Sequence, residues 1–113
     1  MTLQELIQAL ELKPLTKPGD YSQIIPTTAY ASDLLSCVMA GATKRSVWIT
    51  LQAHGNIVAV ATLLDLSAII ITEGAQPESA TIDKANEENV ILLSTRLNTY
   101  QLSGRLWELV LQD

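Results

Sequence analysis

Residues 47–74 constrain the fold more than any other part of the chain. Two short runs rich in β-branched residues flank a run of Ala, Leu and Val that has the length of a helix. This order predicts a strand–helix–strand unit whose helix starts at Gly55 and Asn56. Residues 69–71 are three consecutive isoleucines without polar alternation, which is typical of a parallel strand covered on both faces.

The alternation of strand and helix continues on both sides of this unit. A strand with a proline inside it, which suits an edge, precedes the unit, and another strand follows it. Four repeats predict an α/β fold: a mainly parallel sheet of four strands, or five, with helices on its faces. The added elements are strands over 24–30 and 90–93, and helices that begin at Ser32, at Pro77, and at Asn98 or Thr99.

The N-terminal segment follows a different pattern. Thr2 and Glu5 have the spacing of a capping box, and Leu3, Leu6 and Leu10 recur at helical intervals. Prolines at 14 and 18 then end the helix. Residues 1–22 are therefore predicted as a helix and connector that form an appendage to an α/β domain over 23–113.

Composition excludes several classes of function. The chain is 48% hydrophobic but 4% aromatic, so its core must be aliphatic. A net charge of −5 argues against nucleic acid and anionic membranes as partners, since both attract basic surfaces. No apolar run approaches the roughly 20 residues of a membrane span. The single cysteine, Cys37, fits a reducing cytoplasm, where we expect the protein to act.

Each predicted strand ends in polar residues. The carboxyl ends of parallel strands share one edge of a sheet, and ligands bind in a crevice there. We therefore expect a small polar or anionic ligand at this edge. The alternative is that these residues only cap helices and end strands. The candidate ligand-binding residues are Thr50, Gln52, His54, Asn56, Thr72 and Glu73.

Catalytic signatures are weak in this sequence. An alternative function is a small phosphotransfer or hydrolytic enzyme that uses His54 and Glu73. A lone histidine without an obvious base or nucleophile beside it favours a structural role. Residues 41–45 lack the Gly-Lys-Ser/Thr ending of a phosphate loop. No cofactor motif or metal-ligand cluster stands out, so we expect neither catalysis nor a cofactor.

The helix over 56–65 is apolar nearly all round, and the last helix has excess apolar residues at Trp107 and Leu111. Either another helix or a second subunit covers such a surface. We favour a homodimer, and a purely structural dimerisation module is a further alternative. The expected interface residues are Ile57, Val60, Ala61, Leu64 and Trp107.

Three stretches resemble the DRTGG domain family, especially its small single-domain members in anaerobic bacteria. They are YASDLLS at 30–36, WITLQAHGNIVAVA at 48–61 and AIIITEG at 68–74. The similarity covers nearly all of the chain from about residue 24 onward. It implies an α/β domain related to the N-terminal domain of HPr kinase/phosphorylase.

The resemblance also implies a regulatory or adaptor role. The module occurs within long phosphate acetyltransferases and between the CBS domains of some pyrophosphatases, and some single-domain members are encoded near iron-only hydrogenases. A partner protein of redox or carbohydrate metabolism is therefore expected. This chain lacks the Asp-Arg-Thr-Gly-Gly string and has Glu73-Gly74-Ala75 instead. It also lacks the phosphate loop and magnesium ligands of the kinase, so kinase activity is not implied.

Overall fold

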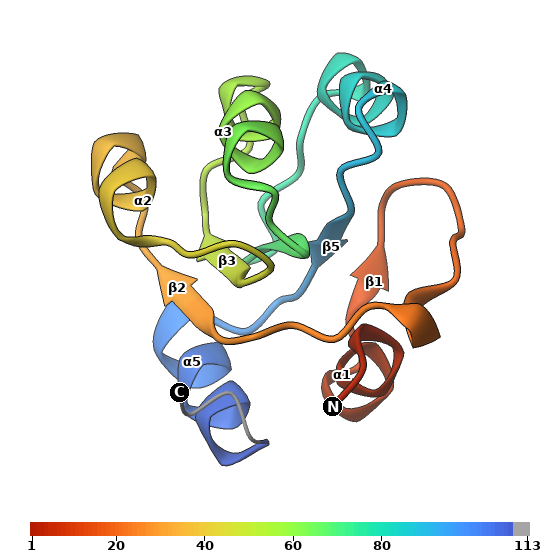
Figure 1. The fold of residues 1–113 in the computed structure, drawn as a ribbon, viewed down its shortest axis with the longest axis vertical. Helices are drawn as coiled ribbons and strands as arrows, with labels where there is room; N and C mark the ends of the chain where they lie inside the picture. The colour runs from red at the N-terminus through yellow and green to blue at the C-terminus, as the bar shows by residue number, and fades with distance from the viewer. Residues whose placement is uncertain (110–113) are drawn as a thin grey trace.

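The computed structural model describes residues 1–109, so the expected excess at Leu111 lies outside the described residues. Figure 1 shows the path of the chain. The elements are α1 (Leu3–Leu10), β1 (Lys13–Pro14), the 3₁₀ helix η1 (Tyr21–Gln23), β2 (Ala29–Ala31), α2 (Leu35–Gly41), β3 (Val47–Thr50), α3 (Asn56–Leu64), β4 (Ala68–Ile71), α4 (Ser79–Glu87), β5 (Leu92–Ser94) and α5 (Thr99–Glu108).

One sheet of five strands organises the molecule, in the order β1-β5-β4-β3-β2. The strands β2 to β5 are parallel to their neighbours, and β1 runs antiparallel to β5 with Lys13 opposite Ser94. The predicted α/β class with a mainly parallel sheet is confirmed. The fifth strand lies in the predicted connector, where Pro14 is tolerated because β1 is at the sheet edge.

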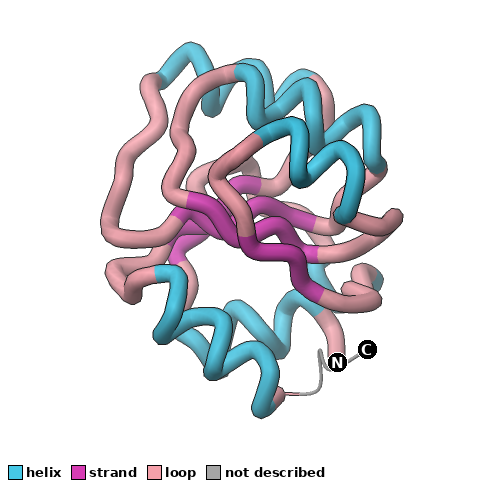
Figure 2. Tube along the Cα trace, turned by 90° about the vertical axis from the view of Figure 1, so that its left-hand side faces the viewer, coloured by secondary structure: helices cyan, strands magenta, loops and turns pink. Residues whose placement is uncertain are grey.

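Helices cover both faces of this sheet. Figures 1 and 2 show α2, α3 and α4 on one face and α1 and α5 on the other. Strand residues alternate between the two layers: Ile70 belongs to the cluster with α1 and α5, and Ile69 and Ile71 to the cluster with α3. All three isoleucines are fully buried, as expected for a strand between two layers of helices.

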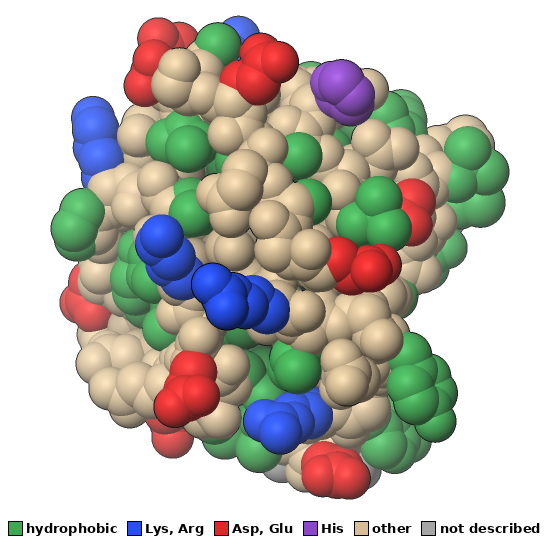
Figure 3. Space-filling model, turned by 180° about the vertical axis from the view of Figure 1, so that it is seen from behind, with side chains coloured by type: hydrophobic (Ala, Val, Ile, Leu, Met, Phe, Trp, Pro, Cys, Tyr) green, Lys and Arg blue, Asp and Glu red, His purple; other side chains and the backbone are tan. Residues whose placement is uncertain are grey.

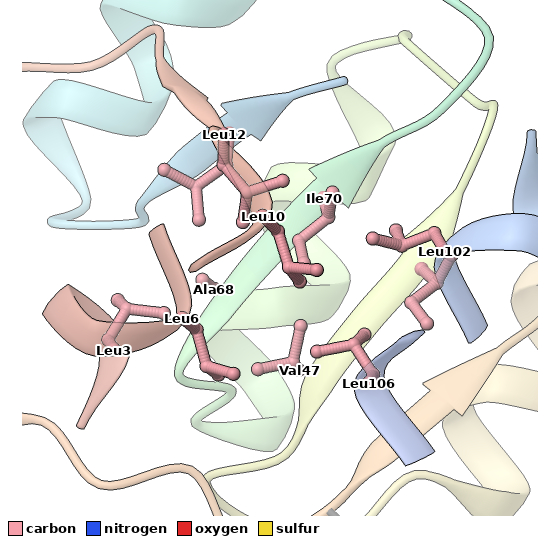
Figure 4. Close-up of a cluster of buried hydrophobic side chains, with 11 residues drawn as sticks. Leu3, Leu6, Leu10, Leu12, Val47, Ala68, Ile70, Leu102 and Leu106 are labelled. Atoms are coloured by element: carbon pink, nitrogen blue, oxygen red, sulfur yellow. The ribbon is translucent and has the colours of Figure 1, made fainter. Parts of the chain in front are cut away.

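The helix α1 is part of the core, which corrects the expectation of an appendage. Leu3 and Leu6 are fully buried, and they belong to one hydrophobic cluster with Leu102 and Leu106 of α5. Figure 4 shows these side chains gathered beside Val47, Ala68 and Ile70 of the sheet. The predicted capping box of Thr2 and Glu5 is present. The domain division at residue 22 stays a prediction.

Several predicted boundaries shift by a few residues. Ser32 does not cap α2; its Oγ accepts a hydrogen bond from the Leu34 N–H at 3.2 Å, and the helix begins at Leu35. The strand β2 begins after the buried Pro26, at Ala29. Gly41 is the last residue of α2, where a Cβ atom would lie 2.5 Å from the Tyr30 hydroxyl. Close packing on Tyr30 therefore explains this glycine.

The face of the apolar helix α3 that packs on the sheet is covered by its own chain, and Leu63 remains exposed on the outer face. The helix packs against α2 on one side and α4 on the other. Ile57, Val60 and Ala61 are at most 7% exposed, because they face the sheet, so they are corrected from interface to core residues. Leu64 is half-buried, and Trp107 is exposed on α5. No helix within residues 1–109 is long and apolar enough to cross a membrane.

Candidate functional site

The predicted ligand residues at the end of β3 are engaged in holding their own loop. Thr50 is fully buried, and its hydroxyl donates to Asp33 Oδ1 at 2.7 Å. The Leu51 N–H donates to the same oxygen at 2.9 Å, and the Gln52 N–H donates to Thr50 Oγ1 at 3.0 Å. The Gln52 side-chain amide donates to the backbone carbonyl of Asp33. These contacts fasten the end of β3 to the loop before α2.

The predicted residues at the end of β4 are also in structural contacts. Thr72 is fully buried and its hydroxyl bonds to that of Thr99 at 3.1 Å, which joins the end of β4 to the start of α5. Glu73 is exposed, with a left-handed φ of 60°. His54 and Asn56 are exposed at the start of α3. The six residues follow neighbouring parallel strands, but none of them lines the cavity found at this edge of the sheet.

That cavity lies one strand further along, at the end of β5. It has a volume of about 640 Å³. Its walls come from the end of α1, β1, the loops after β4 and β5, and α5. The lining residues are Leu10, Glu11, Lys13, Gly74, Gln76, Ser94, Thr95, Arg96, Leu97 and Arg105.

The topology explains why a cavity forms at the end of β5. The chain leaves β4 toward α4 on one face of the sheet and leaves β5 toward α5 on the other (Figure 1). Connections that diverge to opposite faces open a crevice between neighbouring strand ends. Because β1 is antiparallel to β5, its first residue, Lys13, lies beside Ser94 at the same edge. The end of α1 therefore closes one side of the crevice.

Positive charge gathers around this cavity. Lys13, Arg96 and Arg105 are three of the seven basic residues in the chain, and Glu11 is the one acidic residue within residues 1–109 that lines the cavity. In the described part of the chain, ion pairs join Lys44 to Asp65 and Lys84 to Glu88, and none involves a cation of the cavity. Figure 3 shows blue Lys and Arg side chains around a hollow on the face seen from behind.

The floor of the cavity is fixed by the backbone. The Gly74 N–H donates to the Thr95 carbonyl at 2.9 Å, and Thr95 Oγ1 accepts from the Leu97 N–H at 3.2 Å. Gly74 has a φ of +67°, which glycine adopts without strain in this turn. Ser94 and Thr95 are nearly buried, whereas the three cationic residues are exposed. The cavity thus combines a hydrogen-bonded floor with a solvent-exposed cationic rim.

This arrangement suits an anion. Guanidinium groups bind carboxylate and phosphate through paired hydrogen bonds, and a lysine ammonium adds a point charge. Excess positive charge in a hollow concentrates anions there even though the whole chain is acidic. Residues 1–109 contain no group of three His, Cys, Asp or Glu side chains placed to hold a metal ion.

Sequence reasoning missed these residues for identifiable reasons. Lys13 falls in the predicted connector, and Arg105 reads as one member of the solvated stripe of the last helix. Arg96 carries the one local signal, because a cation directly follows the polar strand end Ser94-Thr95. The pattern did not show that β1 and α5 bring the other two cations to it.

Comparisons with known proteins agree with this fold. The regulatory region of a Clostridium perfringens pyrophosphatase, made of CBS and DRTGG domains and solved in complex with the activator diadenosine tetraphosphate, is similar with a TM-score of 0.74 and 18% identity. The match covers 93% of this chain and 45% of that one, so this chain spans less than half of that region. No curated protein matches the chain. A family model described as the DRTGG domain matches residues 18–109, and the chain belongs to the DRTGG domain family.

Proposed function

We propose that this protein is a noncatalytic regulatory domain that binds a small phosphate-bearing anion in the cavity at the end of β5. One observation carries the proposal: Lys13, Arg96 and Arg105 surround one cavity without an ion-pair partner among residues 1–109, in a chain of net charge −5. Such a cluster repels itself, and a bound anion relieves that repulsion.

The comparison supports a regulatory class. The similar pyrophosphatase region is regulatory and was solved with an activator that carries four phosphates. The enzyme alternative gains no such support, because His54 and Glu73 are exposed and line none of the cavities described for this structure. A catalytic pair needs mutual contact and a site that restricts water.

Self-association is the second part of the proposal. The buried face of α3 is unavailable, but Leu34 before α2, Met39 on α2 and Leu63 on α3 are 60%, 49% and 68% exposed on neighbouring helices. These exposed apolar side chains support a homodimer whose interface is formed by the solvent-facing sides of α2 and α3. Sedimentation of the wild type and of Leu63→Lys tests this part: the wild type should sediment as a dimer and the variant as a monomer.

Calorimetric titration with sodium tripolyphosphate tests the ligand site. The wild-type chain should bind it, and higher ionic strength should weaken the affinity. Arg96→Ala and Arg105→Ala should each weaken binding by about tenfold or more, since each removes a charged hydrogen-bond donor. Ligand at about 100 times its dissociation constant should add about 2.7 kcal/mol to the free energy of unfolding.

Matched variants separate the cavity from general charge effects. Lys84→Ala removes one positive charge from α4, outside the cavity, and should leave the affinity nearly unchanged. His54→Ala tests the site expected from the sequence and should also bind normally. If the wild type gives no binding at millimolar tripolyphosphate, or if Lys84→Ala weakens binding as much as Arg96→Ala, the proposed site is wrong.

A further inference from the structure

A second hollow continues from the cationic cavity along the surface of α5. It has a volume of about 580 Å³ and shares two lining residues, Leu97 and Arg105, with the first cavity. The two hollows therefore meet at the Arg105 side chain. Each has a volume in the range of about 300–1,000 Å³ that is usual for small-molecule sites.

The second hollow, which we call the α5 groove, presents an aromatic ring beside open space. Tyr100 lines it and is 87% exposed, so its ring contributes little to the core. Gly104 lies one helical turn further on, on the same side of the helix. Among residues 1–109, no atom lies within 4 Å of where a Cβ atom at Gly104 would be. The ring of Tyr100 therefore lies next to open space over Gly104.

Hydrogen-bonding groups complete the groove. Ser103 is one of the lining residues, and its Oγ is buried beneath the groove surface without a hydrogen-bond partner among the described residues. A buried hydroxyl without a partner is unusual in a folded protein. Glu108 lines the same groove and supplies a carboxylate that accepts from hydroxyl or amino groups.

We propose that the α5 groove holds the base of a nucleoside triphosphate whose phosphates occupy the cationic cavity. This inference rests on the proposed function and adds the class of ligand. The cationic rim of the cavity suits a ligand with several negative charges. The adjoining groove offers the Tyr100 ring, on which a planar group can stack, and polar groups beside it. Tyr100 stacks on the base, Arg105 lies where the base and phosphate portions meet, and the Glu108 carboxylate accepts a hydrogen bond from the nucleoside.

Comparison of ATP with tripolyphosphate in magnesium-free buffer tests the inference, because the two carry the same number of phosphates. ATP should bind about fivefold to a hundredfold more tightly, which is the range expected from one stacked base. Tyr100→Ala should remove this excess affinity and leave tripolyphosphate binding unchanged. Tyr100→Phe keeps the ring and should retain the excess. In the wild type, the Tyr100 ring proton signals should shift upfield with ATP but not with tripolyphosphate.

The outcomes distinguish this inference from the proposed function. If tripolyphosphate binds and ATP binds no more tightly, the α5 groove holds no base, although the cationic site stands. The inference is also wrong if the ATP excess survives in Tyr100→Ala. If neither compound binds the wild-type chain, the proposed function fails, and the inference fails with it.

Discussion

The ends of β3 and β5 lie on the same edge of the sheet but use their polar residues differently. At the end of β3, the Thr50 hydroxyl and the Leu51 N–H both bond to Asp33, so the polar groups satisfy one another. At the end of β5, Arg96 is joined by Lys13 and Arg105 around a cavity, and none of the three forms an ion pair within residues 1–109. The end of β3 is closed by internal hydrogen bonds, whereas the end of β5 borders a cavity with a cationic rim.

The difference arises from where the chain goes next. The helices α3 and α4, which follow β3 and β4, lie on the same face of the sheet, so their connections run side by side. The helix α5, which follows β5, lies on the opposite face. The polar strand end that borders the cationic cavity is therefore the one where neighbouring connections separate, as expected for a crevice in a parallel sheet.

The largest expected effect tests whether the β3–α3 unit is structural. Val60→Lys places a charge on the buried face of α3, and we expect a loss of about 3–5 kcal/mol in the free energy of unfolding, because no buried partner compensates it. Leu63→Lys, on the exposed face, should change the stability of the monomer by no more than about 0.5 kcal/mol, when both proteins are diluted below the concentration at which they dimerise. Urea unfolding measures both. If the Val60→Lys protein had normal stability and were only monomeric, the buried face of α3 would have to be part of a subunit interface.

A smaller effect is expected at the end of β3. Asp33→Ala leaves the buried Thr50 hydroxyl and the Leu51 N–H without their acceptor, which should lower the free energy of unfolding by about 1–3 kcal/mol. Asp33→Asn keeps an acceptor oxygen and should lose less. Both variants should bind tripolyphosphate as the wild type does in calorimetry. If the Asp33 variants had normal stability but no longer bound tripolyphosphate, the binding site would lie at the end of β3.

The cavity at β5 should respond to its own acidic residue. Glu11→Gln removes the one negative charge among the described lining residues and should tighten tripolyphosphate binding by about two- to tenfold, through reduced repulsion. Glu87→Gln makes the same change of charge on α4 and serves as the control in the same titration. Equal gains in both variants would mean that only the net charge of the chain matters.

The smallest effect concerns the start of α1. Hydrogen bonds from the backbone N–H and the hydroxyl of Thr2 hold the pKa of Glu5 below its ordinary value. A carboxyl with a lowered folded-state pKa stabilises the fold above its unfolded pKa, and this contribution is lost as the pH falls through the folded-state pKa. The stability difference between wild type and Glu5→Ala should therefore shrink in acid. A difference that is constant from neutral pH to pH values below the folded-state pKa would contradict the capping role.

Local signals in the sequence predicted the elements well. The capping box at Thr2, the start of the last helix at Asn98 or Thr99, and the apolar runs of β3, α3 and β4 have short-range causes, and the structure confirms them. The strand β1 has two residues and no periodicity, so only its pairing with β5 defines it. The spacing of apolar residues in α5 also does not show which face of the sheet the helix covers, because Leu102 and Leu106 could pack against either face. The cavity depends on both features and was therefore missed.

Leu10 belongs both to the hydrophobic core and to the wall of the cationic cavity. It is 5% exposed within the cluster of α1 and α5, and it is one of the residues that line the cavity. We expect a ligand in the cavity to contact the end of α1 and so to hold this helix in place. Amide exchange in α1 should slow as the cavity fills, because opening that helix then requires the ligand to leave. We therefore expect ligand binding to stabilise α1 without a change in the shape of the protein.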